Sequence, residues 1–213
     1  MPDPLFDPRL DDYLESLVPP RPPELQALED QARQTGFPII GPVCGQLCYQ
    51  VARMTGARSV FEMGSGYGYS TAWFARAVQE NGGGVVHHVV WDMNLSYRAR
   101  TLLRRLGFEG VVEYHIGEAV ETLRALPGPF DLIFNDIDKE AYPASLPVIA
   151  AKLRPGGVLI IDNMLWGGRI FNPDDVAAST EGVREFTRRI ASDPNWIVSL
   201  APVRDGMIVA YKR

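Results

Sequence analysis

Short apolar runs recur along the chain from residue 58 and alternate with segments whose apolar residues have helical spacing. Five runs rich in β-branched and aromatic residues are predicted to be strands: "RSVFEM", "VVHHVVW", "VVEYHI", "FDLIFND" and "GGVLIIDN". Helices are predicted between them at "STAWFARAVQE", "LSYRARTLLRRLG", "EAVETLRALP" and "YPASLPVIAAKLRPGG". Strands that alternate with helices indicate an α/β fold with a parallel sheet covered on both faces.

The two ends of the chain follow other patterns. After a helix at "TEGVREFTRRIAS", the runs "WIVSLAPV" and "GMIVAYKR" are joined by "RDG", which predicts a closing antiparallel hairpin. Residues 1–40 are proline-rich and contain a predicted helix at "ELQALEDQARQTG", and a further helix is predicted at "GQLCYQVARMTG". We therefore expect a doubly wound, Rossmann-like sheet of about seven strands, preceded by a helical segment.

Composition narrows the class of protein. With 213 residues, 46% of them hydrophobic, the chain is long enough for one well-buried core, so we expect a single domain over residues 1–213. A net charge of −5 argues against a nucleic-acid partner. No apolar stretch approaches the roughly 20 residues that span a bilayer, and a signal peptide is not recognisable, so we expect a cytoplasmic protein that does not bind membranes. Cys44 and Cys48 are predicted to be buried apolar thiols.

A glycine-rich loop follows the first predicted strand. In "VFEMGSGYGYS", Gly64, Gly66 and Gly68 come directly after a strand that ends near Glu62. A carboxylate there would repel a pyrophosphate and attract an ammonium group, which favours S-adenosylmethionine (SAM) over a dinucleotide. Asp92, which ends the second strand, suits the ribose hydroxyls of a nucleoside, although a strand-end acid can also simply meet solvent.

Two later strands also end in acids. Asp136 ends one strand, Asp162 and Asn163 end the next, and parallel strands bring their carboxyl ends to one edge of a sheet. Carboxylate and amide oxygens without thiolate or imidazole suit magnesium or calcium better than zinc. The alternative is that these acids end strands only because the chain meets water there. Lys139, three residues after Asp136, is either a surface lysine or a base beside the cation.

These motifs together resemble one enzyme family. "FEMGSGYGYS", "VVWDM", "GEA", "NDIDKEAY", "DNMLWGG" and "PVRDG" occur in the order and spacing of the cation-dependent O-methyltransferases, the family of catechol and caffeoyl-coenzyme A O-methyltransferases and their bacterial relatives. The resemblance covers residues 24–213 and is most specific in D-x-D-K-x-x-Y and D-N-x-L-W. It implies a SAM-dependent O-methyltransferase with the Rossmann-like methyltransferase sheet.

The resemblance also implies roles for individual residues. The SAM site would comprise Ile40, Glu62, Gly64, Ser65, Gly68, Ser70, Asp92, Ala119 and Asp138. The ligands of Mg²⁺, or of another divalent cation such as Ca²⁺ or Mn²⁺, would be Asp136, Asp162 and Asn163. Lys139 matches the general base of the catechol enzymes. Trp166 and Tyr142 are candidates to wall an aromatic acceptor, and equally for core packing.

The implied reaction is methyl transfer to a hydroxyl of a catechol-like phenol whose two oxygens chelate the cation. Relatives also suggest a homodimer, with residues 1–40 as an acceptor lid or dimer contact. Two alternatives stay open: a methyltransferase of a hydroxylated tRNA base, which needs a basic patch such as Arg98, Arg100, Arg104 and Arg105, and a non-catalytic SAM-binding module. Thr187, Arg204 and Gly167 depart from the family pattern where acceptor pockets vary, and Asn135 has no explanation in the sequence.

Overall fold

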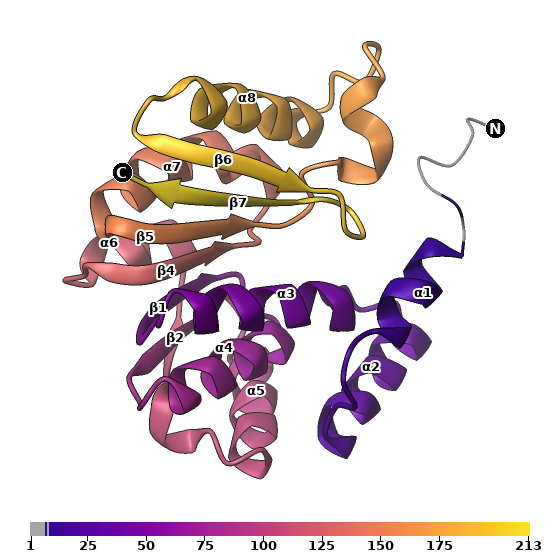
Figure 1. Ribbon diagram of the computed structural model, residues 1–213, viewed down its shortest axis with the longest axis vertical. Coiled ribbons are helices and arrows are strands. Elements are labelled where there is room, and N and C mark those ends of the chain that lie inside the picture. The colour runs from indigo at the N-terminus through magenta and orange to yellow at the C-terminus, as the bar shows by residue number, and fades with distance from the viewer. Residues whose placement is uncertain (1–6, 8) are drawn as a thin grey trace.

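A seven-stranded sheet forms the centre of the molecule in a computed structural model that describes residue 7 and residues 9–213. The strand order is β3-β2-β1-β4-β5-β7-β6 (Figure 1). The strands are β1 (Ser59–Met63), β2 (Val85–Val90), β3 (Val112–Ile116), β4 (Phe130–Asn135), β5 (Leu153–Ile161), β6 (Trp196–Ala201) and β7 (Met207–Lys212). The first five are parallel, and β7 is antiparallel to both β5 and β6. The predicted doubly wound sheet and its closing hairpin are confirmed.

The order of the strands reverses between β1 and β4, and ligands bind at such a switch point in doubly wound sheets. The register aligns Met63 of β1 with Asn135 of β4, and Asn135 in turn with Ile161 of β5. The residues that follow these strands therefore emerge at the same edge. This places Gly64, Asp136 and Asp162 side by side on adjacent strands.

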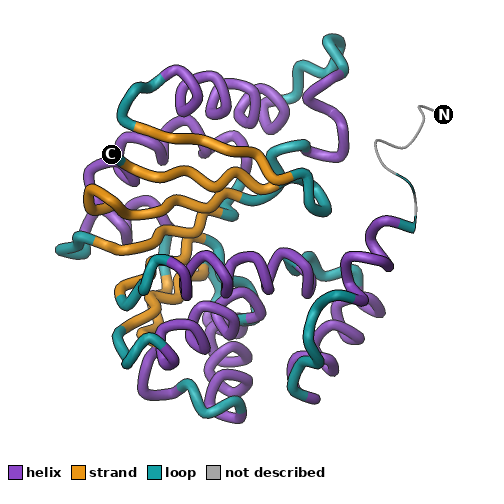
Figure 2. The backbone as a smooth tube through the Cα atoms, viewed as in Figure 1, coloured by secondary structure: helices purple, strands orange, loops and turns teal. Residues whose placement is uncertain are grey.

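Helices cover both faces of the sheet (Figure 2). Their bounds are α1 (Leu10–Ser16), α2 (Pro23–Thr35), α3 (Gly41–Met54), α4 (Tyr69–Glu80), α5 (Met93–Arg105), α6 (Ala119–Ala125), α7 (Tyr142–Lys152) and α8 (Ala178–Ser192), with 3₁₀ turns η1 (Glu109–Val111), η2 (Lys139–Ala141) and η3 (Trp166–Phe171). One apolar core lies between the sheet and α3, α4 and α5, and a second lies under α6, α7 and α8. Among the described helices, none has the length and apolar character needed to cross a membrane.

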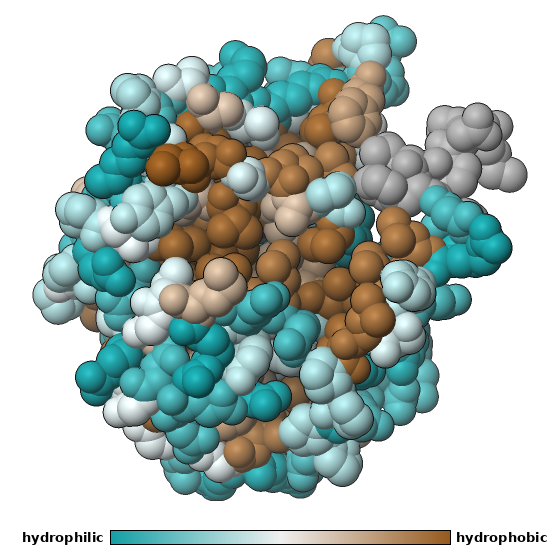
Figure 3. Space-filling view, viewed as in Figure 1, coloured by the Kyte–Doolittle hydropathy of each residue, from teal (hydrophilic) through white to brown (hydrophobic). Residues whose placement is uncertain are grey.

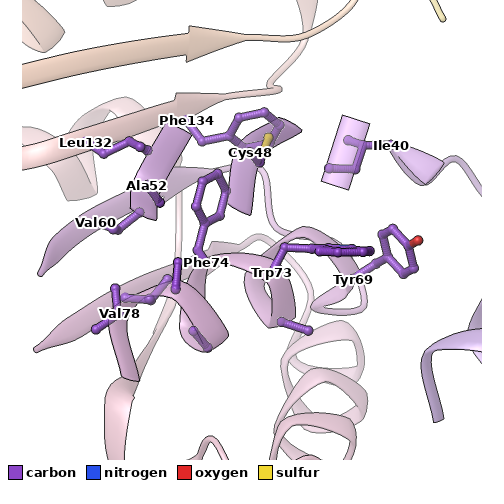
Figure 4. Close-up of a cluster of buried hydrophobic side chains, with 14 of the residues drawn as sticks. Ile40, Cys48, Ala52, Val60, Tyr69, Trp73, Phe74, Val78, Leu132 and Phe134 are labelled. Carbon is purple, nitrogen blue, oxygen red and sulfur yellow. The ribbon is translucent and has the colours of Figure 1, made fainter. Parts of the chain in front are cut away.

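The first core packs α3 and α4 onto β1 and β4 (Figure 4). Phe74 of α4 lies 5.5 Å from Phe134 of β4, measured between ring centres, and both rings are fully buried. Cys44 and Cys48 are buried free thiols in this core, as predicted, and burial raises the pKa of Cys44 to about 12. These thiols therefore stay protonated and act as small apolar side chains.

Candidate functional site

A cavity of about 590 Å³ opens at the carboxyl edge of the sheet, large enough for a nucleoside together with a small second molecule. Most of the predicted site residues line it: Ile40, Gly64, Ser65, Ser70, Ala119, Asp136, Asp138, Lys139, Asp162, Asn163 and Trp166. Four predicted residues are not part of its lining: Glu62, Gly68, Asp92 and Tyr142. The sheet edge thus brings the residues of the two predicted sites into one cavity.

Two glycines shape the loop after β1. Gly64 has a φ of +85°, and a Cβ atom there would lie 2.4 Å from the carbonyl oxygen of Asp136, so only glycine lets β1 and β4 end this close together. Gly68 also has a φ of +85°, and a Cβ atom there would lie 2.9 Å from the Cβ of Ala99 in α5. Gly64 therefore belongs to the cavity wall, whereas Gly68 allows α4 to pack against α5.

Glu62 is fully buried behind the cavity wall and one of its carboxylate oxygens is unpaired. Oε2 accepts a hydrogen bond from Thr71 Oγ1 at 2.5 Å, whereas Oε1 has no hydrogen-bond partner among the described residues. Burial raises the pKa of Glu62 to about 7, opposed by the nearby hydroxyls of Ser70, Thr71 and Ser65, of which Thr71 forms the hydrogen bond to Oε2. Because Ser65 and Ser70 line the cavity, Glu62 lies one side chain away from a ligand and offers it an acceptor.

His88 of β2 holds Thr71 from the other side. Its Nδ1 lies 3.0 Å from Thr71 Oγ1, and burial lowers the pKa of His88 to about 3, so its ring is neutral. The 4.0 Å approach of His88 Nδ1 to Glu62 Oε2 is therefore not an ion pair. Since the Thr71 hydroxyl donates to Glu62, the ring supplies the Nδ1 proton, and the chain His88–Thr71–Glu62 fixes the carboxylate.

Two carboxylates face each other across the ends of β4 and β5. Asp162 is almost completely buried, and its pKa is raised to about 7, first by burial and second by the negative charge of Asp136. Loss of hydration also raises the pKa of Asp136, opposed by Lys139, whose Nζ lies 2.8 Å from Asp136 Oδ1. Arg204 Nη1 lies 3.7 Å from Asp162 Oδ2. The negative charge of each carboxylate therefore disfavours ionisation of the other in the absence of a compensating positive charge.

Asn163 adds a third oxygen to this pair. Its φ is +61°, and its side-chain Nδ2 donates to Asp205 Oδ2 at 3.2 Å, which leaves Oδ1 available as a ligand. The same Asp205 accepts a hydrogen bond from the backbone of Gly167 at 2.5 Å and so ties the loop after β5 to the β6–β7 turn. Two carboxylates and one amide oxygen are the ligand types that Mg²⁺ and Ca²⁺ prefer, so the residues present fit such an ion.

Lys139 and Trp166 form the part of the cavity beside the acidic pair. Lys139 is buried except for 8% of its surface, and its Nζ donates to Asp136 Oδ1 and to the carbonyl oxygen of Ile137. The Lys139 Nζ lies 5.7 Å from the centre of the Trp166 ring, and Trp166 lines the cavity. Tyr142 is fully buried, and its hydroxyl donates to the carbonyl oxygen of Asp162 at 3.0 Å. Of the two candidate wall residues, Trp166 lines the cavity and Tyr142 supports the strand end from the core.

The predicted nucleoside end of the site is formed by α5 and α6. Asp92 caps α5, with its Oδ1 accepting a hydrogen bond from the backbone of Asn94 at 2.6 Å, and lies next to Trp91 of the cavity wall. Ala119 is the first residue of α6 and lines the cavity. Ile40 and Asp138 line it from the segments before α3 and η2. The cavity therefore extends from the acidic pair to the ends of β2 and β3.

The structure gives positions in the site to residues that received no role from the sequence: Thr71 and His88 behind Glu62, Asp205 behind Asn163, and Arg204 in the cavity wall. A signal for His88 was present, because two histidines interrupt the otherwise apolar run "VVHHVV". Asn135 is now explained: it is buried, and its Nδ2 donates to Ser145 Oγ at 3.1 Å. Asn135 therefore fastens the start of α7 to the end of β4.

The chain is similar to known proteins over nearly its whole length. Residues 26–213 match the family described as O-methyltransferase. The chain is 27% identical over 190 residues to a catechol O-methyltransferase of Niastella koreensis, covering 86% of this chain and 85% of the relative. It is 31% identical over 172 residues to catechol O-methyltransferase domain-containing protein 1 of Mus musculus, covering 78% of this chain and 65% of the relative.

Solved structures agree with these relatives. An O-methyltransferase from Bacillus cereus in complex with SAH superposes with a TM-score of 0.86 at 27% identity, covering 96% of this chain and 97% of the other. The O-methyltransferase TomG from Streptomyces achromogenes, in complex with SAM, gives a TM-score of 0.84 at 28% identity and covers 95% of both chains. The similarity therefore extends across the whole sheet and its helices.

Proposed function

Because the chain belongs to the O-methyltransferase family, we propose that it moves the methyl group of SAM to a hydroxyl of a catechol-like small molecule, with a divalent cation and Lys139 as catalytic groups. The protein is a SAM-dependent O-methyltransferase. The proposal concerns three further points: the divalent cation, Lys139 as the base, and the class of acceptor. The observation that carries it is the pair of Asp136, which is partly exposed, and Asp162, which is buried, beside Lys139 in the cavity that adjoins the glycine loop.

The SAM end of the cavity is proposed from its charges. The free Oε1 of Glu62 would accept a hydrogen bond from the ammonium group of the methionine part, and Ser65 and Ser70 lie between this carboxylate and the cavity. Asp92 would bind the ribose, and Ala119 would border the adenine. This arrangement would bring the methyl group toward the acidic pair, because Gly64 of the glycine loop lies against the backbone of Asp136.

Asp136, Asp162 and Asn163 would hold the cation, and Mg²⁺ is the ion that these three oxygens suit best. When bound, it would supply the positive charge that lowers the pKa of an acceptor hydroxyl. The chain contributes two further effects. Its buried carboxylates favour a divalent ion over a monovalent one, and Asp205 keeps the Asn163 oxygen directed toward the ion.

Lys139 is proposed to take the proton from the acceptor hydroxyl at Nζ. The backbone oxygen of Ile137 and Asp136 Oδ1 hold the amine in place, and the nearby Trp166 ring offers a flat surface for an aromatic acceptor. The resulting oxygen anion would form the new O–CH₃ bond with the methyl group of SAM, and the sulfonium sulfur would leave as the neutral thioether of SAH. Much of the rate enhancement would come from holding the two reactants in contact, which contributes up to about 7–11 kcal/mol in well-oriented systems.

The acceptor class is tested with a panel of phenols assayed with SAM and Mg²⁺. An ortho-diphenol should be methylated, whereas a meta-diphenol and a monophenol of similar size, which cannot chelate a cation through two oxygens, should react at least about a hundredfold more slowly. Equal rates for ortho- and meta-diphenols would contradict the proposed chelation. Methylation of none of the phenols would leave the family assignment intact but remove the proposed acceptor class.

The tRNA-base alternative receives little support from α5. Arg98 stacks on the Tyr67 ring at 3.6 Å and Arg100 on the Tyr114 ring at 4.2 Å, measured from each guanidinium carbon to the ring centre. Arg104 forms an ion pair with Glu109 at 3.1 Å. These arginines are thus engaged within the chain, which favours a small acceptor. Binding of tRNA at low salt, lost when Arg98 and Arg105 are replaced together, would reverse this preference.

The affinity for SAM is predicted to depend on pH through Glu62. Only the ionised carboxylate attracts an ammonium group, and its pKa is raised to about 7, so SAM should bind more tightly as pH rises from 6 to 8. Thr71→Val removes a hydrogen bond that stabilises the ionised carboxylate, so the increase in SAM affinity should occur at higher pH. At pH 7 the variant should bind SAM about tenfold more weakly. Calorimetric titrations from pH 6 to pH 9 measure both effects.

Thr71→Ser is the matched control, because it keeps the hydroxyl and should retain the pH profile of the native protein. The valine variant should bind SAM more tightly at pH 8 than at pH 7, which a general folding defect would not produce. A Thr71→Val profile identical to that of the native protein would contradict the role of Glu62.

The homodimer and the role of residues 1–40 stay predictions. An apolar area gathers over β6 and β7 next to α3 (Figure 3), and Ile197 and Tyr211, which pair across these strands, are both about half exposed. Such a face favours a second copy as partner.

In the N-terminal segment, Glu29 of α2 accepts hydrogen bonds from Arg21 and from Tyr69 of α4, which fastens α2 beside the glycine loop.

A further inference from the structure

A second group of metal-ligating side chains lies on β2 and β3, outside the cavity. His87 of β2 and Glu113 and His115 of β3 each offer one ligand atom, and these three atoms lie within 4.8 Å of one another. None of the three residues lines the cavity described above. The proposed methyltransferase mechanism uses none of them.

The sheet holds these residues in place. In the parallel register of β2 and β3, His87 lies opposite Glu113, and His115 is two residues further along β3, on the same face of the sheet. The His87 ring packs against Phe130 at 5.4 Å and Phe61 at 6.1 Å, measured between ring centres, which restricts its movement. Two of the three ligands are thus partly buried on a rigid scaffold, and Glu113 is the exposed, adjustable one.

The distances match a tetrahedral metal site. Zinc binds imidazole nitrogen and carboxylate oxygen at about 2.0–2.2 Å, so neighbouring ligand atoms in a tetrahedron lie roughly 3.3–3.5 Å apart. His87 Nδ1 lies 3.0 Å from His115 Nε2 and 3.4 Å from Glu113 Oε2. A small shift of the rings would open the distance between His87 Nδ1 and His115 Nε2 to this value, and a tetrahedral ion would keep a fourth position for water or an external ligand.

The protonation state also favours a metal. Burial lowers the pKa of both His87 and His115, which favours the uncharged form of both rings. One of the two facing nitrogens donates the proton of their 3.0 Å hydrogen bond, and on metal binding that proton would move to the other nitrogen of the same ring, which frees both facing lone pairs for the metal. Two imidazoles and one carboxylate suit zinc, whereas the oxygen set of Asp136, Asp162 and Asn163 suits magnesium. The two sites therefore differ in the metal they select.

We propose that His87, Glu113 and His115 form a binding site for one Zn²⁺ ion that fastens the edge strand β3 to β2. The ion takes Nδ1 of His87, Nε2 of His115 and one carboxylate oxygen of Glu113. The site stabilises the outer edge of the sheet, where β3 leads into α6 and Ala119. It contributes no group to methyl transfer.

The three histidines of the chain allow a direct test, because His88 is a built-in control. Untagged full-length protein carrying Asp162→Asn, which disables the oxygen site, is titrated with ZnCl₂ while ¹⁵N NMR follows the imidazole nitrogens. One equivalent of Zn²⁺ should shift the signals of His87 and His115. The signals of His88, which is buried in the core, should stay unchanged. Zn²⁺ that shifts neither His87 nor His115 would overturn the proposal.

Matched substitutions identify the ligands. In the same background, His115→Gln and Glu113→Gln should each weaken Zn²⁺ binding by about tenfold or more, whereas Glu109→Gln, at an equally exposed position, should not change it. Both glutamate variants change exposed side chains and should fold normally. Unchanged Zn²⁺ affinity in either His115→Gln or Glu113→Gln would contradict the three-ligand site.

Discussion

Asp162→Asn is expected to lower the rate of methyl transfer by about a thousandfold or more and, at the same time, to stabilise the metal-free protein. The loss of rate follows from the loss of a charged metal ligand in the proposed cation site. The gain in stability follows from removing the buried carboxylate of Asp162, which the carboxylate of Asp136 repels. Few other substitutions in the cavity should move activity and stability in opposite directions.

The stability change has a definite dependence on pH. The pKa of Asp162 in the folded protein is about 7, above its value of about 3.9 in an unfolded chain, so the folded state binds the proton more tightly. Ionisation of Asp162 therefore lowers the stability of the native protein as pH rises from about 4 to about 7. The asparagine variant has no carboxylate at this position and does not undergo this loss. At pH 8 the variant should be more stable by on the order of 2–4 kcal/mol, and at pH 4 the difference should nearly vanish.

Denaturant unfolding in the presence of a chelator, at pH 4, 6 and 8, measures this difference. Asp30→Asn is the control, because Asp30 is exposed on α2 and pairs only with Arg33 at the surface. Its stability should follow that of the native protein at every pH. An Asp162→Asn variant that is less stable than the native protein at pH 8, or that keeps native activity with Mg²⁺, would contradict the account of the acidic pair.

Lys139→Met is expected to lower kcat by about a hundredfold to ten-thousandfold while the affinity for SAM changes little. The reason is that methionine keeps the length and most of the packing of the side chain but cannot take a proton from the acceptor. The residual activity should rise with pH, because a more alkaline solution ionises the phenol without help. Small primary amines added to the variant should restore part of the lost rate.

The matched control is Lys152→Met at the opposite end of the sheet, where Nζ donates to the carbonyl oxygen of Leu126. This variant loses a lysine and a backbone hydrogen bond but no group of the cavity, so its kcat should stay within about twofold of the native value. If Lys139→Met retains native kcat and the native pH profile, the proton leaves the acceptor by another route.

The sheet was predictable because each parallel strand is an apolar run and each connecting helix has an apolar face. The closing hairpin was predictable from "RDG" between two β-rich runs. The sequence did not predict the three 3₁₀ turns, nor α1, which buries none of its residues and so shows little periodicity, nor the start of β5 at Leu153. The segment "RPGG" within β5 contains turn-forming residues, and the strand register shifts there.

The acidic pair was predictable from one geometric rule, because parallel strands end at a common edge and Asp136 and Asp162 directly follow such strands. The residues that support Glu62 were not predictable, since they depend on which residues meet across strands and helices. Thr71 and His88 are 17 residues apart and meet only through the pairing of β1 with β2 and the placement of α4. The depth of Tyr142 below the cavity is likewise decided by the packing of α7 and α8.

The central claim is tested most directly by measuring methyl transfer from isotope-labelled SAM to an ortho-diphenol. The rate is measured first in the presence of a chelator and then after Mg²⁺ has been added back. We expect no product above background in the chelator, full recovery when Mg²⁺ is returned in excess, and no recovery for Asp162→Asn under the same conditions. Product formation at an unchanged rate in the chelator would contradict a cation held by Asp136, Asp162 and Asn163.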